Sequence, residues 1–439
     1  MTTVKLNDPS AFELVSGLWK SDRLPLTTGR VLRSTNFNGD GLLDFSDVVE
    51  LEVEERHAAK RQLKDGDIII ERSGGGPKQP VGRVAFFKAP DEQAYFSSNF
   101  TTTLRIRDQT LLDPEFVSLY LHALYLNGDT ETLQRATTGI RNLDWQGYLN
   151  FEVPKLDRQS QFAVRTLISK VRKAYQCEQS ILMVQRELKQ QVMRQLFACG
   201  MRSEEQKETE IGLIPKSWNV VSFSVVREWL QYGTSIRCDV KEAAYPVLRI
   251  PNIGSGRVIP NDLKYCDLSN TEAKKYVLQQ GDLIFIRTNG VLERLGSCAV
   301  YNGVPGNSLF ASYLIRARLK PIVDPRFIAH FYGSTLGTSL VAGRATPASD
   351  GKYNLNTGTI DSLPLPLPAL IEEQRDIADV LDALDQKIEL HQRMKSVLDE
   401  LFRSLLNKLM TGELTVDDLD LSVLPPEEPQ TQTEAEVQS

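Results

Sequence analysis

The most regular hydrophobic pattern of the chain lies in two Pro-free stretches, residues 159–199 and 372–411. In both, apolar residues recur at steps of three and four, which is typical of one helix face packing on a partner. Adding 213 to each apolar position of the first stretch gives an apolar position of the second, which predicts two copies of one long helix. The matched positions are Val164, Ile168, Val171, Tyr175, Ile181, Val184, Leu188, Val192 and Leu196, and then Ile377, Leu381, Leu384, Ile388, Met394, Val397, Leu401, Leu405 and Leu409.

The two helices are predicted to pack against each other. A helix of about 37 residues spans roughly 55 Å, far more than the mean helix of about 11–12 residues, so it is not expected to be an internal core element. Matching apolar faces can be buried against each other, and an antiparallel pairing would relate the two halves by a pseudo-twofold axis. Because the pattern is not a strict seven-residue repeat, we expect coiled-coil-like packing without long supercoiling.

Shorter segments repeat at nearly the same offset. The offset drifts only between 211 and 216, as small insertions and deletions in loops would produce. The chain is therefore predicted to be a duplicated unit, in which a β-rich region precedes each helix. The clearest matches are 31–36 (VLRSTN) with 247–252 (VLRIPN), 66–73 (GDIIIERS) with 281–288 (GDLIFIRT), and 113–116 (DPEF) with 324–327 (DPRF).

The predicted fold class is α+β, with two pseudo-symmetric, mostly β domains that are each followed by a long helix. Gly200 and Gly412 follow the helices at matching positions and are expected to cap them. The tail is rich in Pro, Glu, Gln and Thr, and we expect it to be disordered. The predicted boundaries are 1–158 for the first domain, 159–200 for the first helical region, 201–371 for the second domain, 372–412 for the second helical region and 413–439 for the acidic tail.

The overall charge does not decide the class of partner. The chain has 51 Lys and Arg against 57 Asp and Glu, a net charge of -6. Residues 413–439 hold eight of the acidic residues and no Lys or Arg, so removing them changes the net charge from -6 to +2. A mildly basic body leaves nucleic acid open as a partner. The chain has neither an apolar run of ~20 residues nor a signal-peptide pattern, so we expect no membrane partner.

The residues that usually carry catalysis are not arranged for it. The five cysteines are scattered without C-x-x-C spacing, which favours a reducing, cytoplasmic location without disulfides or a cysteine-based zinc site. A phosphate-binding loop, a G-x-G-x-x-G motif and the Asn-Pro-Pro-aromatic tetrapeptide of amino-group DNA methyltransferases are all missing from the sequence. The four histidines lack the spacing of metal ligands or of a nucleophile's partner. We therefore predict a non-catalytic chain with no cofactor and no metal of its own.

The segments after the two Gly-Asp strands are the best candidates for contacting a ligand. Residues 72–83 combine glycines with Arg, Lys and Gln, and residues 287–294 take the equivalent place in the second copy. Glycines let a backbone approach phosphate closely, and Arg and Gln match guanine and adenine edges in DNA. Further polar, basic loops lie at 137–142 and 344–354. The candidate DNA-contacting residues are Arg33, Asn36, Arg72, Ser73, Lys78, Gln79, Arg83, Arg141, Arg249, Asn252, Arg287, Thr288, Asn289, Arg294, Arg344 and Lys352.

A solvated hairpin loop is the alternative interpretation of each of these segments, because charge on a loop also promotes solubility. The loops recur in both copies around a shared Gly-Asp frame, with different residues at their tips. Two domains that bind different targets would need the same framework with different residues in their loops. The recurrence therefore favours ligand contact.

Together these features resemble the specificity (S) subunit of Type I restriction–modification systems. The resemblance rests on the two Gly-Asp strands that lead into Arg-Ser and Arg-Thr. Residues 209–218 (TEIGLIPKSW) are similar to the family's opening of its second recognition domain, and residues 365–378 are similar to the start of its helical region. The resemblance covers almost the whole chain apart from the acidic tail. The first domain departs from it, because residues 16–22 match that opening only in part.

The resemblance implies that each domain reads one half of a bipartite target in double-stranded DNA. The helices would set the spacer and dock two methyltransferase (M) subunits, and restriction (R) subunits would join through that assembly. S-adenosylmethionine, ATP and Mg would belong to those partners. Two other classes remain open. A protein-interaction scaffold built on a duplicated helix-linked module would show no salt-dependent affinity for DNA, and an enzyme with unusual motifs would show activity in isolation.

Overall fold

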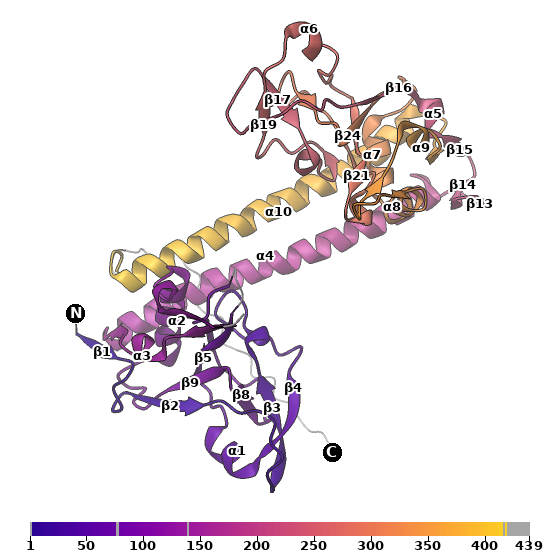
Figure 1. The fold of residues 1–439 in the computed structure, drawn as a ribbon. Helices are drawn as coiled ribbons and strands as arrows, with labels where there is room; N and C mark the ends of the chain where they lie inside the picture. Colours follow the sequence, from indigo (N-terminus) through magenta and orange to yellow (C-terminus); the bar gives the residue numbers. More distant parts are fainter. Residues whose placement is uncertain (1, 76–78, 138–139, 416–417, 419–439) are drawn as a thin grey trace, which may run out of the picture. The chain divides into compact units, whose positions relative to one another are not determined.

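The structure, a computed structural model, consists of two compact units (Figure 1). Unit 1 joins Met1–Glu178 to the chain from Met394 onward, and unit 2 is Gln179–Arg393. Each unit holds one β-rich globular region together with part of α4 (Arg158–Cys199) and part of α10 (Ile371–Thr411). Most of the acidic tail lies outside the described residues. The residues that the structure describes are 2–75, 79–137, 140–415 and 418.

The globular region of unit 1 contains β1 (Thr3–Lys5), β2 (Phe12–Ser16), β3 (Leu26–Leu32), β4 (Val49–Glu54), α1 (Glu55–Arg61), β5 (Ile68–Glu71), β6 (Ser73–Gly75), β7 (Val84–Phe86), β8 (Tyr95–Ser97), β9 (Thr101–Ile106), α2 (Pro114–Leu126), β10 (Gln134–Thr137), β11 (Ile140–Leu143), α3 (Trp145–Tyr148) and β12 (Glu152–Pro154). Its main sheet has the order β2-β9-β5-β7, and all neighbours pair antiparallel. Smaller sheets have the orders β4-β3-β8, β10-β11-β6 and β1-β12. All four residues of β5 are buried, as expected for a central strand covered on both faces.

The globular region of unit 2 contains β13 (Gln206–Thr209), β14 (Gly212–Pro215), β15 (Asn219–Ser222), α5 (Phe223–Val226), β16 (Arg227–Tyr232), β17 (Tyr245–Leu248), β18 (Gly256–Arg257), β19 (Lys264–Cys266), α6 (Asn270–Ala273), β20 (Leu283–Ile286), β21 (Thr288–Asn289), β22 (Cys298–Val300), β23 (Leu309–Phe310), β24 (Leu314–Leu319), α7 (Pro325–Gly333), α8 (Thr335–Ala342), β25 (Thr346–Pro347), β26 (Tyr353–Asn354), α9 (Thr357–Asp361) and β27 (Pro364–Leu367). Its main sheet, β16-β24-β20-β22-β18, repeats that of unit 1 with one added strand. The sheets β19-β17-β23 and β21-β26-β25 likewise repeat β4-β3-β8 and β10-β11-β6. The predicted α+β duplication is confirmed.

The long helices are part of the core of each unit. In unit 1, Val164 and Ile168 of α4 belong to one buried cluster with Phe116 of α2 and with Phe402 and Leu406 of α10. At about 25 cal/mol per Å² of buried apolar surface, such side chains each contribute roughly 1.5–3 kcal/mol. Unit 1 is therefore held together by segments that are more than 200 residues apart in the sequence.

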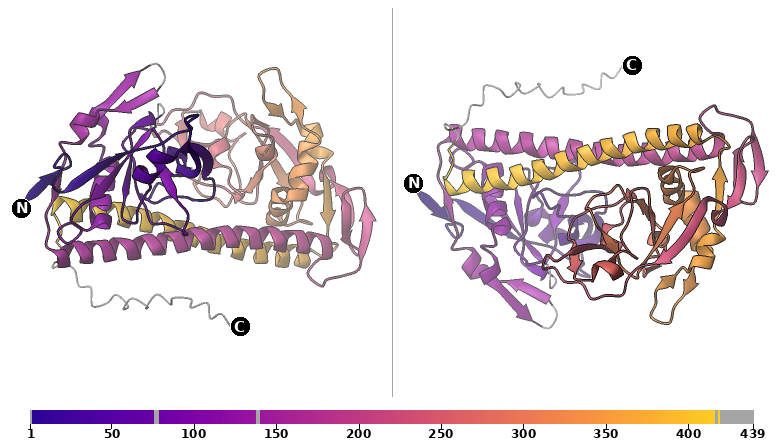
Figure 2. Two further views of the ribbon diagram at one scale, coloured as in Figure 1. Left: turned by 90° about the horizontal axis from the view of Figure 1, so that it is seen from below. Right: turned by 90° about the horizontal axis from the view of Figure 1, so that it is seen from above.

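Unit 2 repeats this arrangement with the opposite ends of the helices. Met193 and Phe197 of α4 share a buried cluster with Ile377 and Leu381 of α10 and with Phe327 of α7. In both units, one stretch of α4 lies beside one stretch of α10 (Figure 2). Each helix ends at a glycine with positive φ, 67° at Gly200 and 74° at Gly412, which is the predicted capping geometry.

The helices pair antiparallel, as predicted. In unit 1, Arg172 in the first half of α4 lies over the ring of Phe402 near the end of α10, 5.5 Å from its centroid. In unit 2, Lys189 in the second half of α4 forms an ion pair of 2.5 Å with Asp385 near the start of α10. Residues later in α4 therefore contact residues earlier in α10.

The predicted apolar stripe is buried only in part. The stripe is buried at the start of each helix and at Leu409, and it is half-buried at Val192 and Leu196 near the end of α4. Ile181 is also only half-buried, and the exposed members are Val184 and Leu188 on α4 and Met394, Val397 and Leu401 on α10. The buried seam instead includes Leu182, Lys189 and Arg172. The expectation that both whole stripes face each other is thus wrong in the middle of the helices. A straight 3.6-residue helix drifts away from a partner when its apolar steps do not follow a 3.5-residue repeat.

A buried glutamine fixes the start of each helix to the neighbouring globular region. Gln161 accepts a hydrogen bond from the backbone N–H of Asp113 (2.7 Å) and donates to the carbonyl oxygens of Leu111 and Leu156. Gln374, 213 positions later, makes the equivalent three bonds at the start of α10. Three bonds from one side chain fix the direction in which each helix leaves its domain. Among the helices described, none has the length and apolar character needed to cross a membrane.

Candidate nucleic-acid interface

The Gly-Asp motif of unit 1 is a structural frame. Gly66 has a φ of 89°, which a residue with a side chain rarely adopts, and the next residue, Asp67, is 1% exposed. The Asp67 carboxylate accepts from Nε and Nη2 of Arg105 on β9, at 2.8 and 2.7 Å, and from the backbone N–H of Lys64. This pair joins the residue before β5 to β9, and it fixes the chain where β5 begins, at Ile68.

Unit 2 builds the same frame. Gly281 has a φ of 90°, and Asp282 is 1% exposed. Its carboxylate accepts from Nε and Nη2 of Arg318 on β24, at 2.6 and 2.9 Å, and from the backbone N–H of Gln279. A second arginine, Arg316, has Nη1 3.7 Å from the same carboxylate. The motif found in the sequence therefore orients the strand, and the residues after it are the ones presented at the edge of the sheet.

In unit 1 the structure brings two of the predicted loops together. β6, which follows β5 after Arg72, pairs with β11, and β11 pairs with β10. The hydroxyl of Ser73 donates to Oδ1 of Asn142 at 2.6 Å, so the segment after the Gly-Asp strand is bonded to the later loop. Arg141 lies beside Asn142 on β11. These residues form one small sheet at the end of β5, called here the unit 1 edge.

Unit 2 has an equivalent edge. Thr288 and Asn289 of β21 pair with Asn354 and Tyr353 of β26, which in turn pairs with β25. Oδ1 of Asn289 accepts from the backbone N–H of Val291 at 2.9 Å and so closes the turn that follows. This sheet, called here the unit 2 edge, again joins the segment after the Gly-Asp strand to a loop that lies about 60 residues later.

Several candidate cations are held by carboxylates of the same unit, which lowers their capacity to bind an external anion. Three of the four pairs have an exposed carboxylate, and exposed ion pairs contribute only about 0–1 kcal/mol; the fourth, between Arg83 and Glu71, is mostly buried. The pairs are Arg33 with Asp47 (3.0 Å), Arg83 with Glu71 (2.8 Å), Arg249 with Asp262 (3.4 Å) and Lys352 with Asp350 (2.7 Å).

In contrast, four candidate arginines lack such a carboxylate. Within the ranges that the structure describes, Arg72, Arg287, Arg294 and Arg344 take part in no ion pair. Lys78 lies outside the described residues. Gln79 lies beside Arg83, and its carbonyl oxygen accepts from Nη1 of Arg83 at 3.0 Å in the amide orientation that satisfies both groups.

The two candidate asparagines, Asn36 and Asn252, are buried and serve the backbone. Oδ1 of Asn36 accepts from the backbone N–H of Arg33, and its amide nitrogen donates to the carbonyl oxygens of Asp44 and Asp47. Asn252 makes the equivalent three bonds in unit 2. Their hydrogen-bonding groups are thus used to shape the turn after β3 and after β17.

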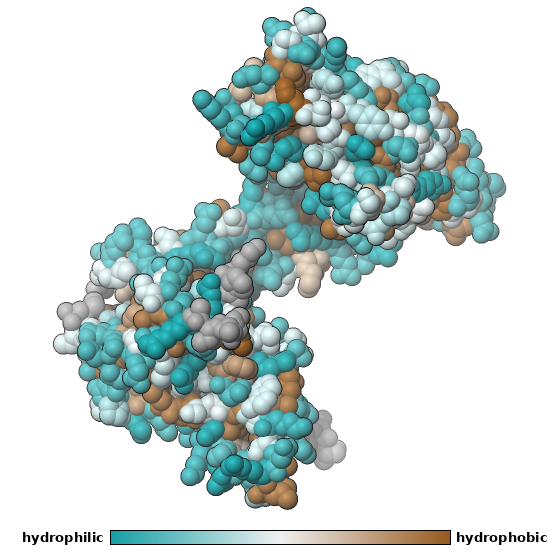
Figure 3. All heavy atoms as spheres, in the orientation of Figure 1, coloured by the Kyte–Doolittle hydropathy of each residue, from teal (hydrophilic) through white to brown (hydrophobic). Residues whose placement is uncertain are grey.

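Sequence reasoning missed two exposed aromatic residues at the edges. Phe100 is 42% exposed and Tyr313, 213 positions later, is 56% exposed. The carbonyl oxygen of Phe100 accepts from the backbone N–H groups of Arg72 and Ser73, and that of Tyr313 accepts from the N–H of Arg287. The shared offset of 213 was the signal that could have identified them. Hydrophilic residues cover much of the face of each unit drawn in Figure 3.

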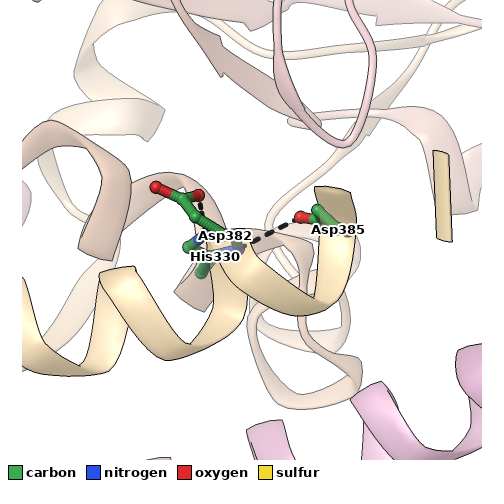
Figure 4. A group of neighbouring side chains, drawn as sticks. All are labelled: His330, Asp382 and Asp385. Atoms are coloured by element: carbon green, nitrogen blue, oxygen red, sulfur yellow. Dashed lines mark hydrogen bonds and ion pairs between the residues drawn. The ribbon is translucent and has the colours of Figure 1, made fainter. Parts of the chain in front are cut away.

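A histidine–carboxylate group lies at the start of α10 in unit 2 (Figure 4). Nε2 of His330 is 2.8 Å from Oδ1 of Asp382, and Nδ1 is 3.9 Å from Oδ2 of Asp385. The other oxygens of these carboxylates are already paired with Arg326 (3.0 Å) and Lys189 (2.5 Å). Because two cations compensate the two carboxylates, we interpret the group as a tie between α7 and α10 rather than as a metal centre.

Comparison with known proteins agrees with this architecture. Residues 216–400 match the family model described as the Type I restriction modification DNA specificity domain. The Type I restriction enzyme EcoKI specificity subunit of Escherichia coli (strain K12) is 25% identical over 408 residues, which cover 90% of this chain and 83% of that protein. The crystal structure of a Type-I restriction–modification S subunit from M. genitalium superposes with a TM-score of 0.57 at 15% identity, over 93% of this chain and 95% of that one.

The fold defines a class of protein in which two β-rich domains are each followed by a long helix and the helices pack together. The chain belongs to the specificity subunits of Type I restriction–modification systems, a non-catalytic family, and it is the DNA specificity subunit of such a complex. The resemblance found in the sequence is confirmed.

Proposed function

We propose that unit 1 and unit 2 each read one half of a bipartite target in double-stranded DNA. The observation that carries this proposal is the repeated edge, in which the same Gly-Asp frame presents different residues in the two units. The unit 1 edge carries Ser73 and Arg141, whereas the unit 2 edge carries Asn289 and Lys352. Because hydrogen bonds to base edges depend on the identity and position of each side chain, two unlike edges fit two unlike half-sites.

The contacts divide by chemistry. The arginines without a carboxylate partner are assigned to bases or phosphates, and the half-buried hydroxyl of Ser73 is assigned to a phosphate. Thr288 is buried, so it acts through the pairing of β21 with β26. The paired cations, such as Arg33 and Arg249, are assigned to phosphate positioning after exchange of their surface carboxylate. Asn36 and Asn252 act indirectly, through the turns that they hold. Binding of the isolated chain should weaken as salt rises, and a gel shift with and without the methyltransferase subunit measures both this salt dependence and the gain from the partner.

We propose that α4 and α10 set the spacing between the half-sites. At 1.5 Å per residue, helices of 42 and 41 residues span about 60 Å, which exceeds the roughly 34–36 Å of one DNA turn. Inserting seven residues into each helix, after Ser180 and after Arg393, adds about 10 Å and turns the faces by only about 20°. Selection of bound sequences from a random pool should return a changed spacer with both half-sites unchanged. An unchanged spacer would refute the spacing role.

The helices also support docking of two methyltransferase subunits. Val184 and Val397 are 59% and 61% exposed, and Leu188 and Leu401, which are also 213 apart, are both exposed to the same degree. Two equivalent apolar patches of this kind fit two copies of one partner, because exposed apolar residues at a helix face mark protein contacts. S-adenosylmethionine, ATP and Mg are assigned to the methyltransferase and restriction subunits, the latter joining through the assembled complex.

A further inference from the structure

The arginine that follows the Gly-Asp strand of unit 1 is held against an aromatic ring. The guanidinium carbon of Arg72 lies 4.7 Å from the ring centroid of Trp145. That ring is itself stacked on Tyr148, with centroids 5.6 Å apart and an angle of 7° between the planes. The Arg72 backbone is fixed as well, because its carbonyl oxygen accepts from the N–H of Leu143 at 2.7 Å. A guanidinium placed in this way loses little rotational freedom when it binds a ligand.

Unit 2 holds its equivalent arginine in the same way. The guanidinium carbon of Arg287 lies 4.9 Å from the ring centroid of Tyr232, and its carbonyl oxygen accepts from the N–H of Leu355 at 2.7 Å. Nη1 of Arg287 donates to the carbonyl oxygen of Ser312 at 3.2 Å. The Tyr232 hydroxyl accepts from the backbone N–H of Thr357, which fixes the ring.

The two rings do not come from equivalent positions. Trp145 begins α3, and the offset of 212 places Thr357 at that position in unit 2. Tyr232 ends β16, and the strand register places Ser16 at that position in unit 1, since Tyr232 pairs with Ile315 and Ser16 with Thr102, 213 positions earlier. The duplicated chain has therefore built the same arginine–ring contact twice from different residues. Duplication of one ancestral unit explains why both units have an arginine at this position. It does not explain why both have an aromatic ring under it, because Trp145 and Tyr232 are not at equivalent positions.

Neither arginine is compensated inside its unit. In the described part of the chain no carboxylate forms an ion pair with Arg72 or Arg287, although Arg83, Arg105 and Arg318 elsewhere in the two units are all paired. Stacking uses the face of a guanidinium and leaves its N–H groups in the plane of the group. Nη1 of Arg72 donates to the hydroxyl of Thr102 (3.4 Å), and Nε and Nη1 of Arg287 donate to the carbonyl oxygens of Leu355 and Ser312. Each edge therefore presents the remaining donors of a fixed, positively charged guanidinium beside an exposed aromatic residue, Phe100 or Tyr313.

We propose that Arg72 and Arg287 each read one guanine, Arg72 in one half-site and Arg287 in the other. Paired donors of arginine match O6 and N7 of guanine in the major groove, and this fork discriminates against a wrong base by about 5- to 150-fold. The ring under each arginine is a positioning residue, because it fixes the plane in which the fork lies. This inference rests on the proposed function, since it requires that each unit reads its own half-site.

The test uses the full chain assembled with its methyltransferase subunits and selects bound sequences from a random duplex pool. Arg72→Lys and Arg287→Lys keep the charge but lose the planar fork. Each should relax preference at a single base pair, a G·C in the wild-type target, by about 5- to 150-fold. The two variants should affect opposite half-sites. Arg30→Lys makes the same change at an arginine that is ion-paired with Glu50 (3.2 Å) and Asp91 (3.3 Å); it is the matched control and should relax no position.

The rings provide an independent readout. Tyr232→Leu removes the ring and should relax the same base pair as Arg287→Lys, whereas Tyr232→Phe keeps the ring and should retain the wild-type preference. Three results would overturn the inference: a uniform loss of affinity without a relaxed position, relaxation at a position that is not G·C, or no change in preference. A wild-type complex that selects no bipartite sequence would instead remove the proposed function, and the inference with it.

Discussion

The Asp282 carboxylate provides the strongest test of how the start of β20 is held in unit 2. It accepts two hydrogen bonds from Arg318, at 2.6 and 2.9 Å, and Nη1 of Arg316 lies 3.7 Å away. Burial lowers the pKa of Arg316 to about 10, which is still well above neutral pH, so both guanidinium groups remain charged. Asp282→Asn keeps the size of the side chain and removes the one carboxylate that faces both cations.

The expected loss of stability in Asp282→Asn comes from the two charged arginines, Arg316 and Arg318, that are left without a carboxylate partner at this position. Removing one partner of a buried ion pair costs about 3–5 kcal/mol, because a charge is left uncompensated in a region of low dielectric. The ring of Trp229, 4.7 and 4.9 Å from the two guanidinium carbons, offsets only about 0.5–2 kcal/mol of this. In unit 1, Asp67→Asn leaves only one cation, Arg105, facing the substituted side chain. The loss of stability in this variant should therefore lie near the lower end of that range, at about 3 kcal/mol.

Hydrogen exchange, measured peptide by peptide, separates the two units. The opening free energy of β20 and β24 should fall in Asp282→Asn, while that of β5 and β9 should not change. Asp262→Asn is the matched control, because its pair with Arg249 is exposed and its φ of 49° is one that Asn tolerates; we expect less than about 1 kcal/mol. A change below 1 kcal/mol in β20 for Asp282→Asn, or an equal change in both units, would refute the reasoning.

Two further predictions concern pH and assembly. Burial lowers the pKa of His122 to about 3, so unit 1 should be fully stable above pH 6.5 and lose about 2 kcal/mol by pH 5, as the unfolded chain gains a proton. Urea unfolding measures the free energy of unfolding at each pH, and in His122→Leu this free energy should no longer fall between pH 6.5 and pH 5. The same pH dependence in the variant as in the wild type would contradict the prediction. For assembly, Leu188→Glu and Leu401→Glu should each reduce the bound methyltransferase subunits from two to one in native mass spectrometry. Gln190→Glu, about 200° around α4 from Leu188, should leave two bound; loss of both subunits from either leucine variant would rule out two separate docking sites.

The duplicated architecture could be predicted because it depends on patterns that repeat along the sequence. Helical periodicity located α4 and α10 to within a residue or two of their ends, at Arg158 and Thr411. The same periodicity placed Val184 and Leu188 in the buried seam, which is wrong. Periodicity defines which residues share a face, but it does not define where along a long helix that face turns toward solvent. That depends on the phase of the partner helix, which the sequence does not state.

The candidate site was found only in part for a similar reason. The Gly-Asp motif correctly marked where β5 and β20 begin, because glycine at positive φ leaves a local signature. It did not reveal that Asp67 is paired with Arg105, since that contact depends on strand register across 38 residues. Nor did it reveal that Trp145 lies under Arg72. Contacts between distant segments decide which arginine is neutralised and which is left to bind, and local patterns carry no information about them.

The differences between the two copies show what the duplicated fold requires and what it leaves free. At the start of α4, Arg165 faces the acidic Glu115 of α2, with Nε and Oε2 3.8 Å apart. At the equivalent place in unit 2 the charges are reversed, because Arg326 of α7, 211 positions after Glu115, pairs with Asp379 (2.6 Å) and Asp382 (3.0 Å) of α10. If α4 and α10 were exchanged, like charges would face each other in both units. The glutamine that binds the backbone at the start of each helix, in contrast, is present in both units. Hydrogen bonds to the backbone thus maintain the shared geometry, while the reversed ion pairs favour the docking of each globular region on the helix that follows it. The edges follow the same rule, since the Gly-Asp frame and the arginine after its strand are kept, while the ring under that arginine and the neighbouring side chains of each edge have diverged.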